Sequence, residues 1–294
     1  MKIKKTTPVK VESERKRLLV SGEPLPKHLL DSTLVDEILD VLMESLDFSI
    51  SDHLHIVDIY LPTIGKKGSA PEINPRIRIF HSVADEYEDE AQEETRKEDT
   101  DKQNAGTPNN KKTDTYVFCL KEKLSSPAPL PGIKERIESE INVTKKSLKT
   151  YFKRNKKKNV LPFVHKERLE LEGSISIQLD SRVQKRKVKV AIDLINGLGS
   201  FSGIYLEVES LCSRGPKDRL KAATAVHELD SLLFTGNKPL FANLQESHII
   251  SQSNRSMATK FFKTLAAKSK KKAAKNKKKK SLRVPKSSGS CCKD

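Results

Sequence analysis

The sequence predicts an α+β fold in which an antiparallel sheet curls into a barrel and amphipathic helices cover its outside. The first observation is a set of six short runs in which apolar and charged residues alternate, as they do along a strand with one apolar face. The second is that the charged faces pair Glu with Glu and Arg with Arg, which is destabilising on neighbouring strands without a counter-charge. The third is a pair of apolar helical stripes, over residues 31–47 and 217–234.

The first alternating run covers residues 11–20. Because side chains alternate across a strand, Glu12, Glu14 and Lys16 are expected on one face, about 7 Å from neighbour to neighbour. Adjacent carboxylates repel each other unless a cation lies between them, and oxygen ligands suit a hard divalent ion such as Mg²⁺ or Mn²⁺. The lysine beside them suits a phosphate group. A surface strand with a solvated charged face would show the same pattern when taken alone.

Five further runs repeat the alternation. They cover residues 74–80, 116–123, 133–141, 164–172 and 204–209. An open antiparallel sheet with one wet face would also alternate in this way. A barrel accounts better for the crowded like charges, because its charged faces converge on a lumen in which acids can hold a metal and bases can hold a polyanion. The apolar faces then point outward and need cover.

Two amphipathic segments can supply this cover. Residues 31–47 place seven apolar side chains on one stripe, with Ser32 or Thr33 as the N-cap. Residues 217–234 carry a second and weaker stripe. Both are expected to be packing surfaces rather than contacts to a cofactor or a membrane.

The order of the charged motifs carries a family resemblance. The opening run is Glu12-Ser13-Glu14-Arg15-Lys16, a Glu-x-Glu-x-Lys pattern. Six more motifs follow in order: Asp58-Ile59-Tyr60, Arg76-Ile77-Arg78, Lys121, Arg136-x-Glu138-x-Glu140, Lys166-x-Arg168, and Asp193 leading into Glu207-Val208-Glu209. Together they resemble the CYTH superfamily of triphosphate tunnel metalloenzymes, which includes class IV adenylate cyclases and thiamine triphosphatases. The resemblance spans roughly residues 10–235.

The resemblance implies an eight-stranded antiparallel β-barrel, the triphosphate tunnel, which binds a triphosphate with Mg²⁺ or Mn²⁺ and cleaves a phosphoanhydride bond. It implies metal binding by the acids Glu12, Glu14, Glu138, Glu140, Glu207 and Glu209. It implies phosphate binding by the bases Lys16, Arg76, Arg78, Lys121, Arg136, Lys166 and Arg168. The chemistry agrees with this division, since phosphoryl transfer depends mainly on positioning and charge neutralisation. The sequence identifies no catalytic base.

The expected domain organisation is a tunnel domain over residues 1–240 and a basic, low-complexity tail over residues 241–294. An acidic insert at residues 84–113 has no apolar run and is expected to be a disordered loop. Asp193 rather than Asp180 is matched to the family position because Gly197-Leu198-Gly199 follows it, although both aspartates end strand-like runs.

The net charge of +17 is concentrated in the tail, since residues 254–294 carry 15 lysines and arginines against one aspartate. Such a tail can bind nucleic acid, polyphosphate or an anionic surface, or it can remain solvated with no dedicated partner. It is expected to be dispensable for the hydrolysis of a small triphosphate. The four cysteines do not suit a disulfide framework and no apolar run reaches transmembrane length, so a cytoplasmic location is expected.

His53 and His55 are the two histidines that a strand would place on one face. Neither a cysteine nor a third histidine stands near them in the sequence, so they are expected to be surface residues rather than zinc ligands.

Three functions remain open at this point. The chain could hydrolyse inorganic triphosphate or an organic triphosphate, it could be a class IV adenylate cyclase that converts ATP to cyclic AMP and pyrophosphate, or it could bind polyphosphate or nucleic acid without cleavage. The paired glutamates argue against the third, because acids weaken anion binding unless a metal neutralises them. The absence of tryptophan, the strongest stacking surface for a purine, favours the first.

Overall fold

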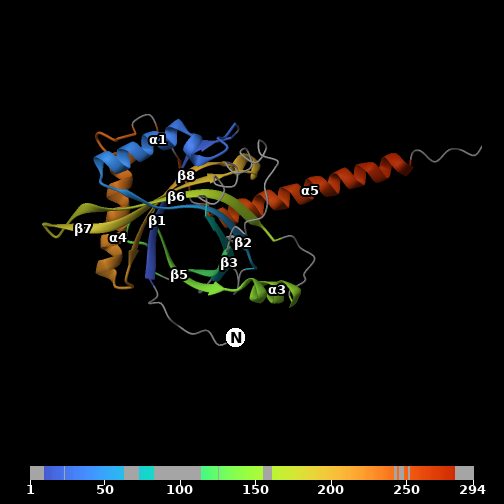
Figure 1. Ribbon diagram of the computed structural model, residues 1–294, viewed down its shortest axis with the longest axis horizontal. Helices are drawn as coiled ribbons and strands as arrows, with labels where there is room; N and C mark the ends of the chain where they lie inside the picture. The colour runs from blue at the N-terminus through green and yellow to red at the C-terminus, as the bar shows by residue number, and fades with distance from the viewer. Residues whose placement is uncertain are drawn as a thin grey trace, which may run out of the picture.

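Eight antiparallel strands close into a ring in the computed structural model, which describes residues 10–22, 24–62, 73–82, 114–124, 126–154, 161–241, 244, 248–250 and 252–281 (Figure 1). The strands are β1 (Lys10–Ser21), β2 (Ser49–Tyr60), β3 (Ile73–Ser82), β4 (Thr115–Lys123), β5 (Lys134–Val143), β6 (Phe163–Leu179), β7 (Arg182–Ile195) and β8 (Gly203–Cys212). Their order is β5-β4-β3-β2-β6-β7-β8-β1, and β1 also pairs with β5. The predicted antiparallel sheet that closes on itself is therefore confirmed.

The β6–β7 hairpin is the longest in the ring and extends beyond it (Figure 1). Its turn is formed by Asp180 and Ser181, which both have a positive φ, of 51° and 62°. Asp193 lies thirteen residues further along β7, where it is fully buried. Asp180 and Asp193, which both end strand-like runs in the sequence, thus have different places: Asp180 lies at an exposed turn and Asp193 lies inside the ring.

Two helices cover the apolar outer face of the ring, as predicted. The first is α1 (Thr33–Asp40), which continues as the π-helical turn η2 (Val41–Ser45), and the second is α4 (Pro216–Asp230), which continues as η4 (Ser231–Thr235). The largest core cluster joins them to β6, β7 and β8, through buried side chains that include Ile38, Leu229, Leu169, Ile192 and Leu206. Burial of this apolar surface is the main stabilising contribution to the fold.

The outer face of β1 differs from the prediction, because it carries two arginines where apolar residues were expected. Arg15 and Arg17 are both buried beneath α4. The carboxylate of Asp230 on α4 lies 2.7 Å from Nη1 of Arg15 and 2.5 Å from Nε of Arg17. A buried guanidinium is tolerated only with a paired counter-charge, so this aspartate is what allows β1 to carry charge on both faces.

The chain beyond residue 240 also packs on the ring. The short strand β9 (His248–Ile249) pairs with β1, and the long helix α5 (Asn254–Ser281) follows it. Met257 and Ala258, in the first turns of α5, are buried against Tyr60, Val164 and Tyr205. The rest of α5 extends away from the ring (Figure 1). The packed body therefore includes the first part of the predicted tail.

Helix α3 (Lys145–Arg154) lies on the outer face of another part of the ring, where Leu148 packs against Leu61 and Ile77. The predicted acidic insert at residues 84–113 falls outside the described residues. Among the helices that the structure does describe, each is too short or too polar to cross a membrane.

Candidate functional site

The interior of the ring is a charged cavity of about 1880 Å³. All eight strands contribute to its wall, and so do several residues of α5. Along β1, β3 and most of β6 the cavity-facing positions alternate with outward positions, as pleating requires. On β6, for example, Lys166, Arg168 and Glu170 line the cavity, whereas Leu169 and Leu171 belong to the outer core.

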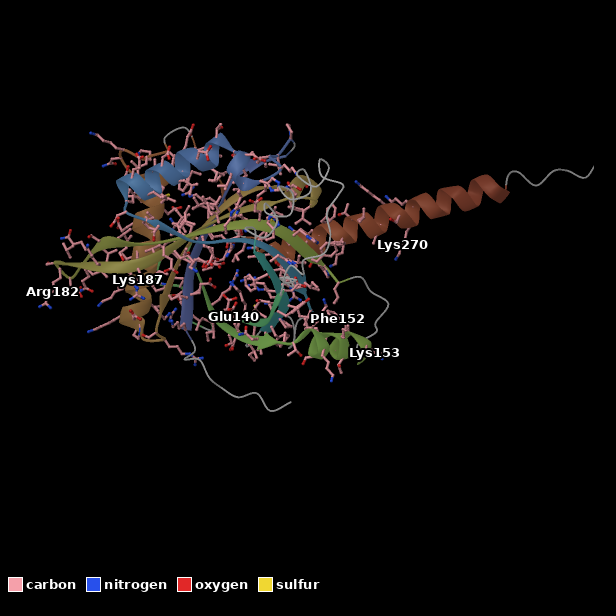
Figure 2. All side chains as sticks on the ribbon, viewed as in Figure 1. Glu140, Phe152, Lys153, Arg182, Lys187 and Lys270 are labelled. Atoms are coloured by element: carbon pink, nitrogen blue, oxygen red, sulfur yellow. The ribbon has the colours of Figure 1, made fainter. Side chains whose placement is uncertain are left out.

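All thirteen residues that the sequence assigned to metal or phosphate lie in the wall of this one cavity. The acids are Glu12, Glu14, Glu138, Glu140, Glu207 and Glu209, and the bases are Lys16, Arg76, Arg78, Lys121, Arg136, Lys166 and Arg168. Figure 2 shows Glu140 beside the lower strands of the ring, whereas Arg182 marks the tip of the β6–β7 hairpin and Lys270 lies out on α5. The structure thus brings these residues together, while their roles stay predictions.

Three of the acids form one cluster. Carboxylate oxygens of Glu12, Glu14 and Glu209 all lie within 4.8 Å of one another. The β1–β8 register places Glu14 directly opposite Glu209, and Glu12 is the next residue on the same face of β1. Burial, together with the charges of Glu12 and Glu207, holds the pKa of Glu209 well above its usual range. A divalent cation bound among these oxygens would remove that repulsion, and three carboxylates suit Mg²⁺ or Mn²⁺.

The other three predicted metal ligands lie elsewhere in the cavity. Glu138 and Glu140, on β5, cluster with Cys119, and the side chain of Glu140 is half exposed. Glu207 accepts hydrogen bonds from Lys16 at 2.8 Å and from Arg168 at 2.6 Å. Burial alone would raise the pKa of Glu207, but these two bases hold it well below its usual range.

A lysine links two of the acidic groups. Nζ of Lys121 lies 2.9 Å from Glu12 and 3.1 Å from Glu138. Burial would lower the pKa of Lys121, but the neighbouring carboxylates raise it well above its ordinary value, so this amine stays charged. The closing β1–β5 pair adds Arg136, whose Nη1 lies 3.1 Å from Glu14.

A fully buried aspartate organises the Arg-x-Arg strand. Oδ1 of Asp58 on β2 accepts a hydrogen bond from Nε of Arg78 at 2.9 Å, and Oδ2 accepts one from Nη1 of Arg76 at 3.3 Å. The second amino group of Arg76 reaches Glu138 at 2.8 Å. Burial would raise the pKa of Asp58, but the two guanidinium groups lower it far below its ordinary value. Two cationic forks are therefore held in place in the cavity wall.

Asp193 plays the same part on the other side of the ring. Its carboxylate accepts hydrogen bonds from Nζ of Lys166 at 2.9 Å and from Nε of Arg168 at 2.5 Å. Burial and the neighbouring charge of Arg168 lower the pKa of Lys166 to about 8. Lys166 is thus a lysine whose charge depends on pH near neutrality.

The sequence motifs contained Asp58 and Asp193 but assigned them no role in the site. A buried acid that aims a neighbouring arginine has no sequence signature of its own, because its role depends on which strands pair. A second group, Asn254, Lys260 and Lys263, enters the cavity wall from α5. Oδ1 of Asn254 accepts a hydrogen bond from Lys16 at 2.6 Å. In the sequence, the feature that could have indicated the packing of α5 on the ring is the set of apolar residues in its first turns, such as Met257.

Comparisons with known proteins add little. No protein-family model matches the chain, and no curated protein does. Among solved structures, the PH1819 protein from Pyrococcus horikoshii OT3 is similar with a TM-score of 0.44 and 17% identity, covering 85% of this chain and 98% of that one. The Mimivirus capping enzyme triphosphatase has a TM-score of 0.32 and 10% identity, covering 78% of this chain and 90% of that one. Both TM-scores lie below 0.5, so neither likeness says what this chain does.

Proposed function

We propose that this chain is a metal-dependent triphosphatase that hydrolyses inorganic triphosphate, or another triphosphate, within the ring, as its resemblance to the CYTH superfamily implies. The observation that carries the proposal is one cavity in which a three-carboxylate cluster lies beside paired cationic side chains. Buried acids whose charges repel one another would weaken the binding of an anion, so a site for anion binding alone does not need them. A triphosphatase needs both groups, one for the metal and one for the phosphates.

The bases of the cavity are suited to a triphosphate. Arg76 and Arg78 present planar forks that can grip phosphate oxygens in bidentate fashion, and Asp58 keeps both forks oriented. Lys166 and Arg168 form the corresponding pair on β6. Lys16, Lys121 and Arg136 complete the basic set. Bound phosphates would replace some of the ion pairs that these bases now make with glutamates.

Glu12, Glu14 and Glu209 are the proposed ligands for Mg²⁺ or Mn²⁺, with Glu138, Glu140 and Glu207 as further acids of the same wall. A bound divalent ion supplies Lewis-acid polarisation of a phosphoryl oxygen and neutralises negative charge. The proposed ligand set consists of oxygens alone, as these hard ions prefer.

In the proposed reaction the oxygen of a water molecule attacks the terminal phosphorus, and the bond from that phosphorus to the bridging oxygen breaks. For inorganic triphosphate the products are orthophosphate and pyrophosphate, and the water proton passes to solvent or to a cavity carboxylate. The arginines stabilise the negative charge on the oxygens around the transferred phosphoryl group. No covalent nucleophile is required.

The proposal extends to the remaining parts of the chain. The tunnel domain is completed by the first turns of α5, and the lysine-rich remainder of that helix is proposed to contact nucleic acid, polyphosphate or an anionic surface through salt-dependent attraction. Cys119 and Cys212 are free, buried thiols, which fits a reducing compartment such as the cytoplasm.

The decisive experiment separates the possible reactions by their products. Purified protein is incubated with inorganic triphosphate, ATP and thiamine triphosphate, each with Mg²⁺ or Mn²⁺, and orthophosphate, pyrophosphate and cyclic AMP are measured. We expect equal amounts of orthophosphate and pyrophosphate from inorganic triphosphate. Cyclic AMP with equimolar pyrophosphate from ATP would replace the hydrolase with an adenylate cyclase. Tight binding of all three compounds without products would leave a non-catalytic binding module.

A further inference from the structure

A second group of ligand-type side chains lies on the outer face of the ring, away from the charged cavity. His53 and His55 are on β2, and Glu167 is on the adjacent strand β6, directly opposite His55 in the register. His28 joins them from the segment before the short helix η1 (Leu29–Asp31). On β6 the neighbours of Glu167, Lys166 and Arg168, point into the cavity, so Glu167 points outward.

The distances within this group are short. Oε2 of Glu167 lies 3.6 Å from Nδ1 of His28 and 3.9 Å from Nε2 of His55. One ligand atom from each of these three residues lies within 4.8 Å of the other two. The imidazole rings of His28 and His55 are stacked, with centroids 6.4 Å apart and planes 5° from parallel.

We propose that His28, His55 and Glu167 form a binding site for a divalent first-row transition-metal ion, with Zn²⁺ as the expected occupant. Ligand atoms of a tetrahedral Zn²⁺ ion, with bonds of about 2.0–2.1 Å, are about 3.3–3.4 Å apart. The observed separations from Glu167 exceed this by a few tenths of an ångström, and the ligand atoms of His28 and His55 lie within 4.8 Å of each other. Side-chain rotations that shorten these separations would bring the three atoms around one ion.

The chemistry of the donors selects the metal. Two imidazoles and one carboxylate suit Zn²⁺ and its neighbours in the first row, whereas Mg²⁺ and Ca²⁺ prefer oxygen ligands alone. The three-carboxylate cluster of the cavity has the opposite preference. One chain would then hold two metal sites of different selectivity, on the two faces of the same sheet.

Two hydrogen bonds hold the carboxylate of Glu167 in position for this role. Oε1 accepts a hydrogen bond from Nε2 of His53 at 2.7 Å, and Oε2 accepts one from the backbone N–H of Leu29 at 3.0 Å. Burial acts to raise the pKa of Glu167, but hydrogen bonds from His53, His55 and Leu29 lower it to about 2. Ligating carboxylates are commonly oriented by such outer partners, so His53 is a positioning residue of the site.

An ion can reach the site from solvent and still be well held. The side chain of Glu167 is only 5% exposed, whereas those of His28 and His55 are 22% and 25% exposed. A water molecule can therefore complete the coordination. The bound metal would add a link between the segment that leads into α1 and strands β2 and β6, which already meet here through the Leu29 hydrogen bond and the stacking of His28 on His55. We expect the ion to stabilise this junction.

The test measures metal binding on the full chain without an affinity tag, after removal of metals and in a large excess of Mg²⁺ that occupies the cavity carboxylates. Zn²⁺ is added in a calorimetric titration, and Co²⁺ is used in parallel because its visible absorption reports nitrogen ligands and coordination number. We expect one Zn²⁺ per chain and a Co²⁺ spectrum of a four-coordinate site. Zn²⁺ should also raise the melting temperature of the protein.

His28→Gln and His55→Gln are each expected to weaken Zn²⁺ binding by well over tenfold, and His53→Gln by about tenfold through loss of the positioning bond. His165→Gln is the matched control, because His165 lies on β6, as Glu167 does, but outside the cluster. It should bind Zn²⁺ as the unsubstituted protein does. His28 lies before η1 rather than in the sheet, so the His28→Gln protein is expected to keep its fold. Circular dichroism checks this.

Two results would overturn the proposal. One is the absence of stoichiometric Zn²⁺ binding in Mg²⁺. The other is Zn²⁺ binding that His28→Gln and His55→Gln leave intact but Glu12→Gln or Glu209→Gln removes, since the ion would then occupy the cavity. Neither result bears on whether the cavity hydrolyses triphosphate, because the two sites share no residue.

Discussion

Arg168 and Asp193 face each other across the β6–β7 pair and are joined by two hydrogen bonds, from Nε to Oδ1 at 2.5 Å and from Nη2 to Oδ2 at 2.7 Å. Both residues are buried. The same Nη2 group reaches Glu207 at 2.6 Å. Asp193 therefore holds a cationic fork toward Glu207, and among the described residues its own charge is balanced by that fork and by Lys166.

Asp193→Asn tests this arrangement. The amide keeps the shape of the side chain but leaves two buried cations with less counter-charge, which costs about 3 kcal/mol or more. We expect a lower free energy of unfolding in urea and a strong loss of triphosphate turnover. Asp180→Asn is the matched control at the exposed turn, where asparagine tolerates the positive φ, and should change stability by less than about 0.5 kcal/mol. Equal stabilities for the two variants would contradict the role of Asp193.

Metal dependence should trace to the three-carboxylate cluster. Glu209→Gln removes one negative ligand with little change in size, so the Mg²⁺ concentration for half-maximal turnover should rise by well over tenfold. Glu172→Gln removes an acid from the same cavity wall, where the side chain is 58% exposed, and should leave the Mg²⁺ requirement unchanged. Full turnover in a chelator would exclude a metal-dependent mechanism altogether.

The Arg-x-Arg strand should dominate substrate binding. Arg76→Ala and Arg78→Ala each delete a fork that Asp58 orients, and loss of a bidentate phosphate contact costs about 2 kcal/mol or more. Steady-state kinetics on inorganic triphosphate should show a fall in kcat/KM of well over tenfold for both. Arg182→Ala, at the tip of the β6–β7 hairpin, should behave as the unsubstituted protein does (Figure 2). Wild-type kinetics for Arg76→Ala and Arg78→Ala would rule out a role in phosphate binding.

Affinity for the substrate should depend on pH through Lys166. Burial and Arg168 lower its pKa to about 8, so this amine is cationic below that pH and becomes neutral above it. KM for a triphosphate should therefore rise as the pH increases from about 7 to about 9, because a phosphate contact loses its charge. Lys166→Arg, which stays charged, should remove most of this rise. Lys121→Arg is the control, since the pKa of Lys121 is raised and its charge does not change in this range. If KM in the unsubstituted protein is constant over this range, Lys166 does not titrate in contact with substrate.

Two truncations should distinguish the role of the docked first turns of α5 from that of its lysine-rich remainder. Deletion of residues 268–294 removes lysines that lie beyond the docked turns, so hydrolysis of a small triphosphate should persist while RNA or polyphosphate binding weakens in a salt-dependent way. Deletion of residues 254–294 also removes the buried Met257 and Ala258 and the Asn254 contact to Lys16, and should reduce both the melting temperature and turnover. This expectation differs from that of the sequence alone, which predicts that the whole segment is dispensable for the hydrolysis of a small triphosphate. An inactive but folded 268–294 deletion would place the distal lysines in the catalytic cavity.

The sequence by itself determined which side chains share one face of a strand. Glu12, Glu14 and Lys16 share a face because strand pleating is a local property with a period of two residues, and the same rule placed Arg76 and Arg78 together. The helical stripes over residues 31–47 and 217–234 were readable for the same reason, since helical periodicity is also local.

Only the tertiary structure decided which of these residues meet. Glu14 and Glu209 are neighbours because β1 pairs with β8, which lies far from it in the sequence, and no local pattern specifies that register. The docking of α5 and the approach of His28 to Glu167 likewise depend on contacts between distant segments. Periodicity sets the direction of a side chain, but the pairing of strands and the packing of helices, which minimise exposed apolar surface over the whole molecule, set its neighbours.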